Sequence, residues 1–180
     1  MKKVLQFAGM ISLALAAVAF VLMMVTPAVV YTVSSSSTIN FAGTMAIFGG
    51  KPDTAQALAL LTTEVKPAVM ALLAWIFAIV AMAILLLGVL LPLLKVKALE
   101  KFSGLLNLCA LVLLVLAGIF MFTVRASFYT AQGFKPEDIP EKAALGAGWV
   151  IGGIIAIVAG AFAILPAAAD FMGKKKGKRK

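Results

Sequence analysis

Four long stretches without a charged side chain dominate this sequence. They run from about Phe7 to Val33, from about Ala68 to Leu94, from about Ser103 to Val124 and from about Leu145 to Ala169. A helix of about 20 apolar residues crosses the ~30 Å hydrocarbon layer of a bilayer. Membrane strands would need alternating apolar and polar residues, and none of the stretches shows this alternation. We therefore predict an all-α membrane protein, a single domain with four transmembrane helices.

Composition supports a membrane rather than an aqueous environment. Hydrophobic residues make up 63% of the 180 residues, whereas about 45–50% is typical of soluble domains. The net charge of +9 would suggest nucleic acid in a soluble protein. Here the cations gather at the ends of the apolar stretches, so orientation in the membrane and anionic lipid explain them better. We expect no nucleic-acid partner.

The distribution of basic residues predicts the orientation. The N-terminus, the turn around Lys95–Lys101 and the tail together carry 11 Lys and Arg residues, and the two segments that alternate with them carry 5. Cytoplasmic segments carry the excess of Lys and Arg. Both termini are therefore predicted to be cytoplasmic, the outer loops to span 34–67 and 125–144, and the basic tail to span 170–180. Lysine-rich edges of this kind suit a bacterial plasma membrane. The competing interpretation, a signal peptide cleaved near Ala19, requires a much shorter apolar run than the one that continues to Val33.

An internal duplication is indicated by the second and fourth stretches. Trp75 precedes Pro92 by 17 residues, and Trp149 precedes Pro166 by 17 residues. Pro67 and Pro140 lie 8 and 9 residues before these tryptophans and fit the first turn of a helix. The pattern predicts two helical hairpins of the same orientation, a parallel repeat of a kind found in transporters. The alternative is chance alignment of Ala- and Leu-rich segments.

The outer loops contain signals for local structure. Thr32 to Phe48 is rich in Thr, Ser, Ile and Phe, which is typical of either a short β-hairpin or an irregular Ser-rich linker. Asp53 or Thr54 is a candidate cap for a helix over about 55–64, which either lies in the outer interface or extends the second span. The acidic residues Glu137, Asp138 and Glu141 suit the positive end of the fourth helix dipole better than a cation site.

Few residues in this sequence are candidates for catalysis or for metal binding. Histidine is absent and Cys109 is the single cysteine, which excludes an intramolecular disulfide and a Cys/His zinc site. Asn107, near the inner edge, is the strongest polar group in the spans. We predict a protein that is not an enzyme and has no cofactor and no metal.

Two further groups of residues are candidate contact sites. Small residues recur every fourth position along the fourth span and permit close approach of another helix, either within the bundle or in a partner or second copy: Gly148, Gly152, Ala156 and Gly160. The tail is expected to be disordered and to contact anionic lipid through Lys174, Lys175, Lys176, Lys178, Arg179 and Lys180.

In topology the chain resembles claudin-type and other four-span (tetraspan) proteins, through its four spans, cytoplasmic ends and longer first outer loop. The resemblance covers the whole chain but no motif, because the Trp and paired Cys of the claudin loop signature are absent between Ser34 and Lys66. It implies a four-helix bundle and no particular function. The sequence favours a non-enzymatic scaffold or accessory subunit that acts through helix and outer-loop contacts; the alternative is a component of an oligomeric transporter or channel.

Overall fold

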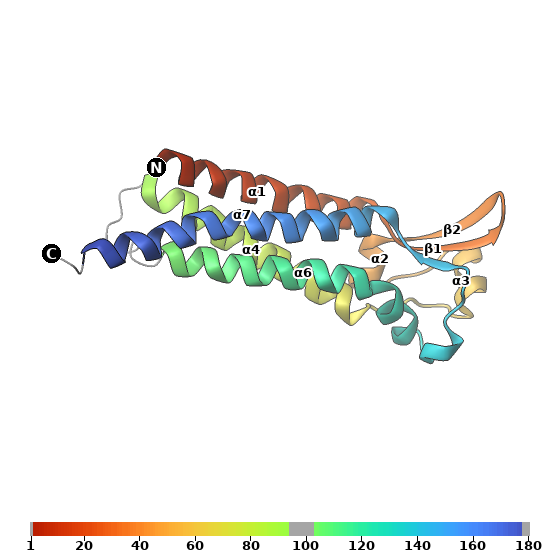
Figure 1. The fold of residues 1–180 in the computed structure, drawn as a ribbon. Coiled ribbons are helices and arrows are strands. Elements are labelled where there is room, and N and C mark those ends of the chain that lie inside the picture. The colour runs from red at the N-terminus through yellow and green to blue at the C-terminus, as the bar shows by residue number, and fades with distance from the viewer. Residues whose placement is uncertain (1, 94–102, 178–180) are drawn as a thin grey trace.

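Four long helices form an antiparallel bundle in the computed structural model, which describes residues 2–93 and 103–177 (Figure 1). They are α1 (Lys2–Val25), α4 (Val69–Leu93), α6 (Ser103–Ala131) and α7 (Ala147–Gly177). Helix α7 packs against α1 and α6, and α4 packs against α6 and α1. The start of α1 and the end of α7 lie at one end of the bundle, which we call the inner end, and the opposite end is the outer end.

Each long helix contains a segment that is long and apolar enough to cross a membrane. The segments are Phe7–Val25, Val69–Leu90, Gly104–Ala131 and Ala147–Leu165. Many large apolar side chains on them are exposed, for example Val21, Leu87 and Ile154. Since water would not tolerate so much exposed apolar surface, lipid is the medium that these faces fit. The chain is a multi-pass membrane protein, as the sequence predicted.

The first helix ends earlier than the sequence analysis expected. It stops at Val25, and the segment that was expected to complete the first span up to Val33 belongs instead to strand β1 (Pro27–Ser34). Pro27 disfavours helical geometry at Thr26, and the β-branched residues that follow favour a strand. Hydrophobicity alone does not separate these two states, which is why the boundary was misplaced.

The boundaries of the third and fourth helices also differ from expectation. Helix α6 continues past Val124 to Ala131 and therefore includes Arg125. Pro140 does not lie in the first turn of α7, because a three-residue strand, β3 (Ala143–Leu145), separates it from the helix start at Ala147. Helix α7 continues past the predicted end of the fourth span at Ala169, as far as Gly177, and so includes Pro166.

A small antiparallel sheet covers the outer end. Of the two alternatives for the first outer loop, the structure shows the hairpin, with β1 paired to β2 (Ser37–Ala42). The second outer loop adds β3 on the other side of β1, so that the strand order is β2-β1-β3. Three short helices complete this end: α2 (Gly43–Phe48), α3 (Thr54–Leu60) and the 3₁₀ helix η1 (Pro136–Asp138). The third strand was not predicted, because its three residues form too short a pattern to read.

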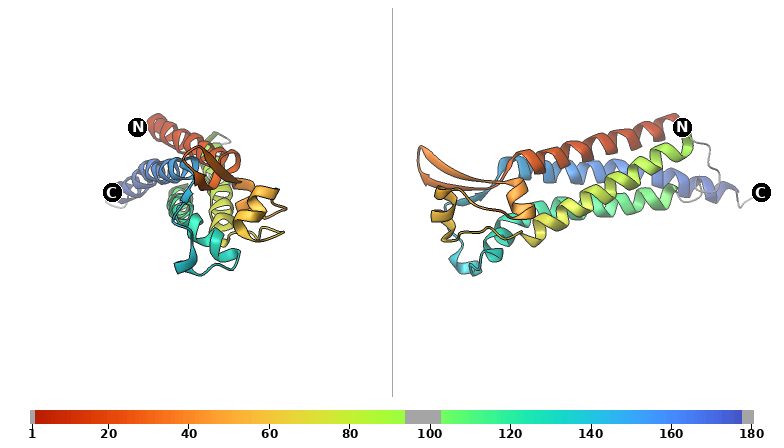
Figure 2. Two further views of the ribbon diagram at one scale, coloured as in Figure 1. Left: turned by 90° about the vertical axis from the view of Figure 1, so that its right-hand side faces the viewer. Right: turned by 180° about the vertical axis from the view of Figure 1, so that it is seen from behind.

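Helix α2 fills a gap between α1 and α4. Helix α4 runs obliquely across the bundle and meets α1 only toward the inner end (Figure 2). At the outer end, the amide of Gly43 donates to the carbonyl of Thr26 at 3.0 Å, and the amide of Ala68 donates to the carbonyl of Ala46 at 2.8 Å. These two bonds tie α2 to the end of α1 and to the start of α4.

The inner half of the bundle is held together by small side chains. Its buried residues include Ala16, Ala81, Ala110 and Ala159, which allow the helix backbones to approach closely. The Oγ of Ser12 on α1 donates to the carbonyl of Ala159 on α7 at 2.7 Å. The described part of this region is therefore a packed interior and not a polar channel.

Candidate functional site: the outer cap

The outer cap is the candidate functional site, and we define it as residues 26–68 and 132–146. It projects beyond the ends of the helices, with the β1-β2 hairpin and α3 farthest from the bundle (Figures 1 and 2). Its structure depends on the bundle beneath it. Phe41 of β2 is fully buried against Phe128 of α6, with ring centroids 5.1 Å apart, and Trp149 at the start of α7 belongs to the same core. The cap and the bundle thus share one apolar core.

Gln132 joins the two outer loops. Its Oε1 accepts from the amide of Lys66 at 2.9 Å, and its Nε2 donates to the carbonyl of Lys66 at 2.9 Å and to that of Phe128 at 3.2 Å. One side-chain amide therefore pairs with both backbone groups of a residue 66 positions away. This arrangement, which we call the Gln132 clamp, fixes the approach to α4 against the end of α6.

Removing the Gln132 clamp is expected to loosen the cap. In the Gln132→Leu variant, the backbone groups of Lys66 lose their partners, which should lower the free energy of unfolding by about 1–2 kcal/mol. Hydrogen exchange of the peptide containing Lys66 should accelerate. Thr63 in the same loop is exposed, and its side chain makes no hydrogen bond within the described residues, so Thr63→Ala is the control and should leave exchange unchanged. Equal exchange in both variants would contradict the role of the clamp.

Helix α3 covers part of the free edge of β2. Asp53 caps the helix as predicted: its side chain accepts from the amide of Gln56, and the Gln56 side chain accepts from the Asp53 amide. The Nε2 of Gln56 also donates to the carbonyl of Asn40 at 2.7 Å. The helix is shorter than expected because it ends at Leu60, and it neither continues α4 nor joins it. Gln56, the partner of Asp53 in the capping box, therefore also covers part of the sheet edge.

The second outer loop is bound to the first along β1. The amide of Thr32 donates to the carbonyl of Lys142 at 3.0 Å, and the amide of Gly146 donates to that of Ala28 at 2.9 Å. The Nη2 of Arg125 donates to the carbonyl of Pro140 at 3.1 Å. Together with the Gln132 clamp, these bonds hold the two outer loops together as one structural unit.

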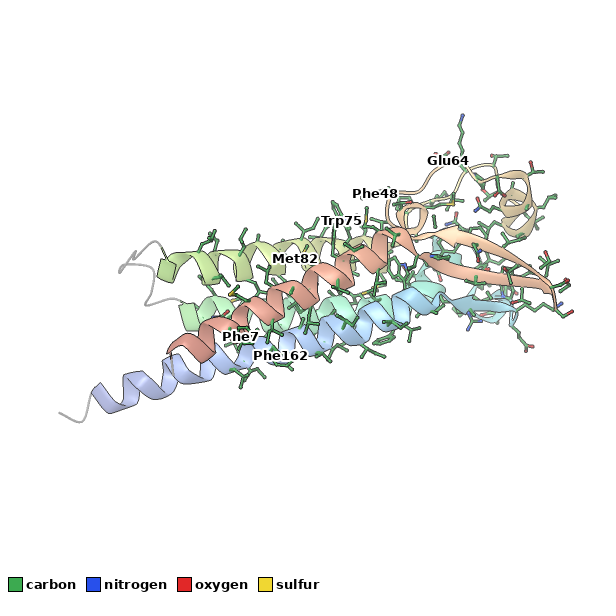
Figure 3. All side chains as sticks on the ribbon, turned by 90° about the horizontal axis from the view of Figure 1, so that it is seen from above. Phe7, Phe48, Glu64, Trp75, Met82 and Phe162 are labelled. Atoms are coloured by element: carbon green, nitrogen blue, oxygen red, sulfur yellow. The ribbon has the colours of Figure 1, made fainter. Side chains whose placement is uncertain are left out.

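The cap presents two exposed surfaces of different character. The hairpin tip from Thr32 to Thr38 is exposed throughout and carries six hydroxyl groups. Leu58 and Leu61 are 71% and 87% exposed, and Leu61 has a positive φ of 52°, which is uncommon for leucine. Phe48 stands edge-on to Trp75 at 5.1 Å where the cap meets α4 (Figure 3). The cap therefore offers both hydroxyl and apolar contact groups.

A groove of about 400 Å³ lies beside the bundle, between the outer ends of α4 and α6. Its lining contains no charged side chain: Val69, Met70, Thr123, Ala126, Ser127, Thr130 and Ala131. The Oγ of Ser127 accepts from the amide of Met70 at 3.1 Å and so satisfies one free donor at the start of α4. The groove offers apolar contact but no group suited to general acid–base chemistry.

The small residues of the fourth span face other helices of the same bundle. A side chain at Gly148 would collide with Thr26, one at Gly152 would come within 2.6 Å of Met121, and one at Gly160 would meet the carbonyl of Leu111. Ala156 is 2% exposed. In this chain the stripe brings α7 close to α1 and α6.

The remaining candidate residues are those of the basic tail, the acidic residues of the second outer loop and Cys109. Helix α7 continues through Lys174, Lys175 and Lys176, where disorder was expected; cations near a helix C-terminus interact favourably with its dipole. Their side chains, the residues Lys178, Arg179 and Lys180, and the turn around Lys97 lie outside the described part of the structure. Glu137, Asp138 and Glu141 are exposed and precede the first turn of α7, so they do not sit on its N-terminus as was predicted. Cys109, which the sequence placed in an apolar run, is exposed on α6.

Comparison with known proteins adds no further assignment. No protein-family model matches the chain, and the search of curated proteins finds no similar sequence.

Proposed function

We propose that this chain is a non-enzymatic membrane scaffold or accessory subunit that binds partners through its outer cap and its lipid-embedded helix faces. The cap is the observation that supports the proposal. Two loops that are distant in sequence are locked together by the Gln132 clamp and by β3, and they rest on a shared core. Pre-ordering a surface in this way lowers the entropic cost of binding. The exposed Leu58 and Leu61 supply apolar contact area.

Photocrosslinking from the cap tests this proposal. A photoreactive amino acid placed at Leu58 or Leu61 should capture a defined membrane protein or a second copy of the chain in native membranes. The same amino acid at Ser35, on the hairpin tip, maps how far the contact extends, and one at Ile154, on the lipid-facing side of α7, tests the helix faces. A chain that is always monomeric and yields no adduct from any position would overturn the proposal.

We further propose that both termini are cytoplasmic and that the membrane is a bacterial plasma membrane. The segments assigned to the inner end carry eleven basic and two acidic residues, and those at the outer end carry five of each. The excess of Lys and Arg therefore belongs to one end, which is what the positive-inside tendency expects of the cytoplasmic side. The same charge supports contact between the tail and anionic lipid, at about 1 kcal/mol per cation near the surface.

Cysteine labelling should report this orientation. In a Cys109→Ser background, a membrane-impermeant maleimide is expected to label Ser35→Cys in intact cells and Lys174→Cys only after permeabilisation. The reverse pattern would invert the orientation, and labelling of both positions in intact cells would refute the placement of the two ends on opposite sides.

The alternative function is a component of an oligomeric transporter or channel, which the repeated Trp–Pro spacing favours. Trp75 and Trp149 share a further property: each has a buried indole Nε1 that finds no hydrogen-bond partner within the described part of the chain. Flux through liposomes at high protein density decides between the two functions. Absence of flux for ions and small solutes would leave the scaffold as the explanation.

A further inference from the structure

Arg125 is the single charged residue within the four apolar segments. It directly follows the uncharged run from Ser103 to Val124, whose 22 residues span about 33 Å as a helix. That length matches the hydrocarbon thickness of a bilayer, about 30 Å. On the outer side, the Arg125 guanidinium reaches the carbonyl of Pro140 in the cap. Arg125 therefore stands where hydrocarbon ends, at the depth of the outer lipid headgroups.

Most N–H donors of the Arg125 guanidinium have no acceptor within the described residues. An arginine side chain has five N–H donors. Within the described residues, Nη2 donates to Pro140 at 3.1 Å, and Nε is buried without an acceptor. Nη1 also lacks a protein acceptor but is not among the buried unpaired atoms, so it is accessible at the surface. The accessible end of the guanidinium thus offers uncommitted donors.

No carboxylate neutralises Arg125 in the described part of the chain. Glu141 directly follows Pro140, the residue to which Arg125 is bound, yet no acidic oxygen lies within the 4.0 Å of an ion pair. Near the end of a membrane helix, a long arginine side chain extends to the interface, where polar partners are available. Because the described residues offer no further acceptor, the free donors of Arg125 are available to an anion or a strong dipole in the headgroup layer.

We propose that Arg125 binds the phosphate group of an outer-leaflet phospholipid. Phosphate oxygens match the planar fork of a guanidinium and form short, charge-assisted hydrogen bonds with it. The bond to Pro140 holds the guanidinium in place, so the cap positions the lipid site. The contact would hold the edge of the cap at a fixed depth in the headgroup layer, independently of the scaffold function proposed above.

The composition of the chain allows a direct test by solid-state NMR. Its only arginines are Arg125 and Arg179, so Arg179→Lys leaves one guanidinium to observe. In phospholipid bilayers, the ¹⁵N-labelled Nη signals of this variant should lose intensity under ³¹P recoupling. The expected N–P separation is on the order of 4 Å, from an N–H···O bond of about 2.8 Å. The Arg125→Lys variant, which retains Arg179, reports separately on the tail.

Three further samples distinguish the source of the anion. In glycolipid bilayers without phosphorus the effect should vanish. If the effect in phospholipid bilayers appears only when inorganic phosphate is added, the ligand is free phosphate and not a lipid. Glu141→Gln should leave the phospholipid effect unchanged. Undiminished Nη signals in phospholipid bilayers, from protein whose Gln132 clamp is intact by hydrogen exchange, would overturn the proposal. Capture of a partner through the cap would be unaffected by that result.

Discussion

The Gly146→Ala variant is expected to lose the ordered outer cap. A Cβ atom at this position would collide with the carbonyl of Pro27, a backbone atom that cannot move aside without displacing β1. The same glycine donates its amide to Ala28 at 2.9 Å and accepts from Trp149 in the first turn of α7 at 3.0 Å. Overpacking usually costs about 1–3 kcal/mol, and loss of the Ala28 bond adds about 1 kcal/mol. We expect the free energy of unfolding to fall by roughly 3–4 kcal/mol.

Unfolding in mixed micelles with increasing SDS, followed by the fluorescence of Trp75 and Trp149, measures this effect. Gly9→Ala is the control, because a Cβ there would make only ordinary contact with Val89, at 3.6 Å. Gly9 lies inside α1, where alanine is the better helix former by up to about 1 kcal/mol. Similar stability in the two variants would show that β1 and α7 are not packed as closely as described.

Phe41→Ala is expected to separate the sheet from the bundle. Phe41 is fully buried and packs on Phe128, which in turn stands edge-on to Tyr129 at 5.7 Å. Truncation of a buried phenylalanine costs about 3–5 kcal/mol. Because Phe41 is the large buried side chain of β2, the cap should become accessible to protease at the hairpin while the spans stay folded.

Limited proteolysis in detergent, combined with the SDS titration, checks this expectation. Phe7→Ala removes the same side chain from α1, where Phe7 is 64% exposed on the outside of the bundle, and it should change neither result (Figure 3). Resistance of the Phe41→Ala hairpin to protease would mean that hydrogen bonding alone holds the cap in place.

Local signals in the sequence were sufficient for several elements. The uncharged stretches located all four helices, because the length of a membrane span is set by the bilayer and not by neighbouring residues. Asp53 was one of two candidate caps, because an N-cap is specified by residue type next to the helix start. The structure adds its reciprocal partner, Gln56, three positions on. The hairpin could be proposed from its β-branched residues, although its start at Pro27 was hidden within an apolar run.

Other features depend on residues that are distant in sequence. The three residues of β3 are recognisable as a strand only because β1 provides their partner. The Gln132 side chain bonds to backbone groups of Lys66. Because every residue carries such groups, the sequence does not show which residue Gln132 contacts. Arg125 was assigned to a loop, because the continuation of α6 to Ala131 depends on its packing against the cap.

The sequence by itself determined that this protein lies in a membrane, how many spans it has and how its charge is distributed. Each of these follows from side-chain chemistry summed along short segments. Only the tertiary structure decided how the two outer loops meet, which helices the small residues of α7 approach, and where Arg125 lies relative to the cap. These properties arise from contacts between different elements, some of them far apart in sequence, such as those of Gln132 with Lys66 and of Ser12 with Ala159. Contacts of that range depend on the relative placement of whole helices, which no local pattern specifies.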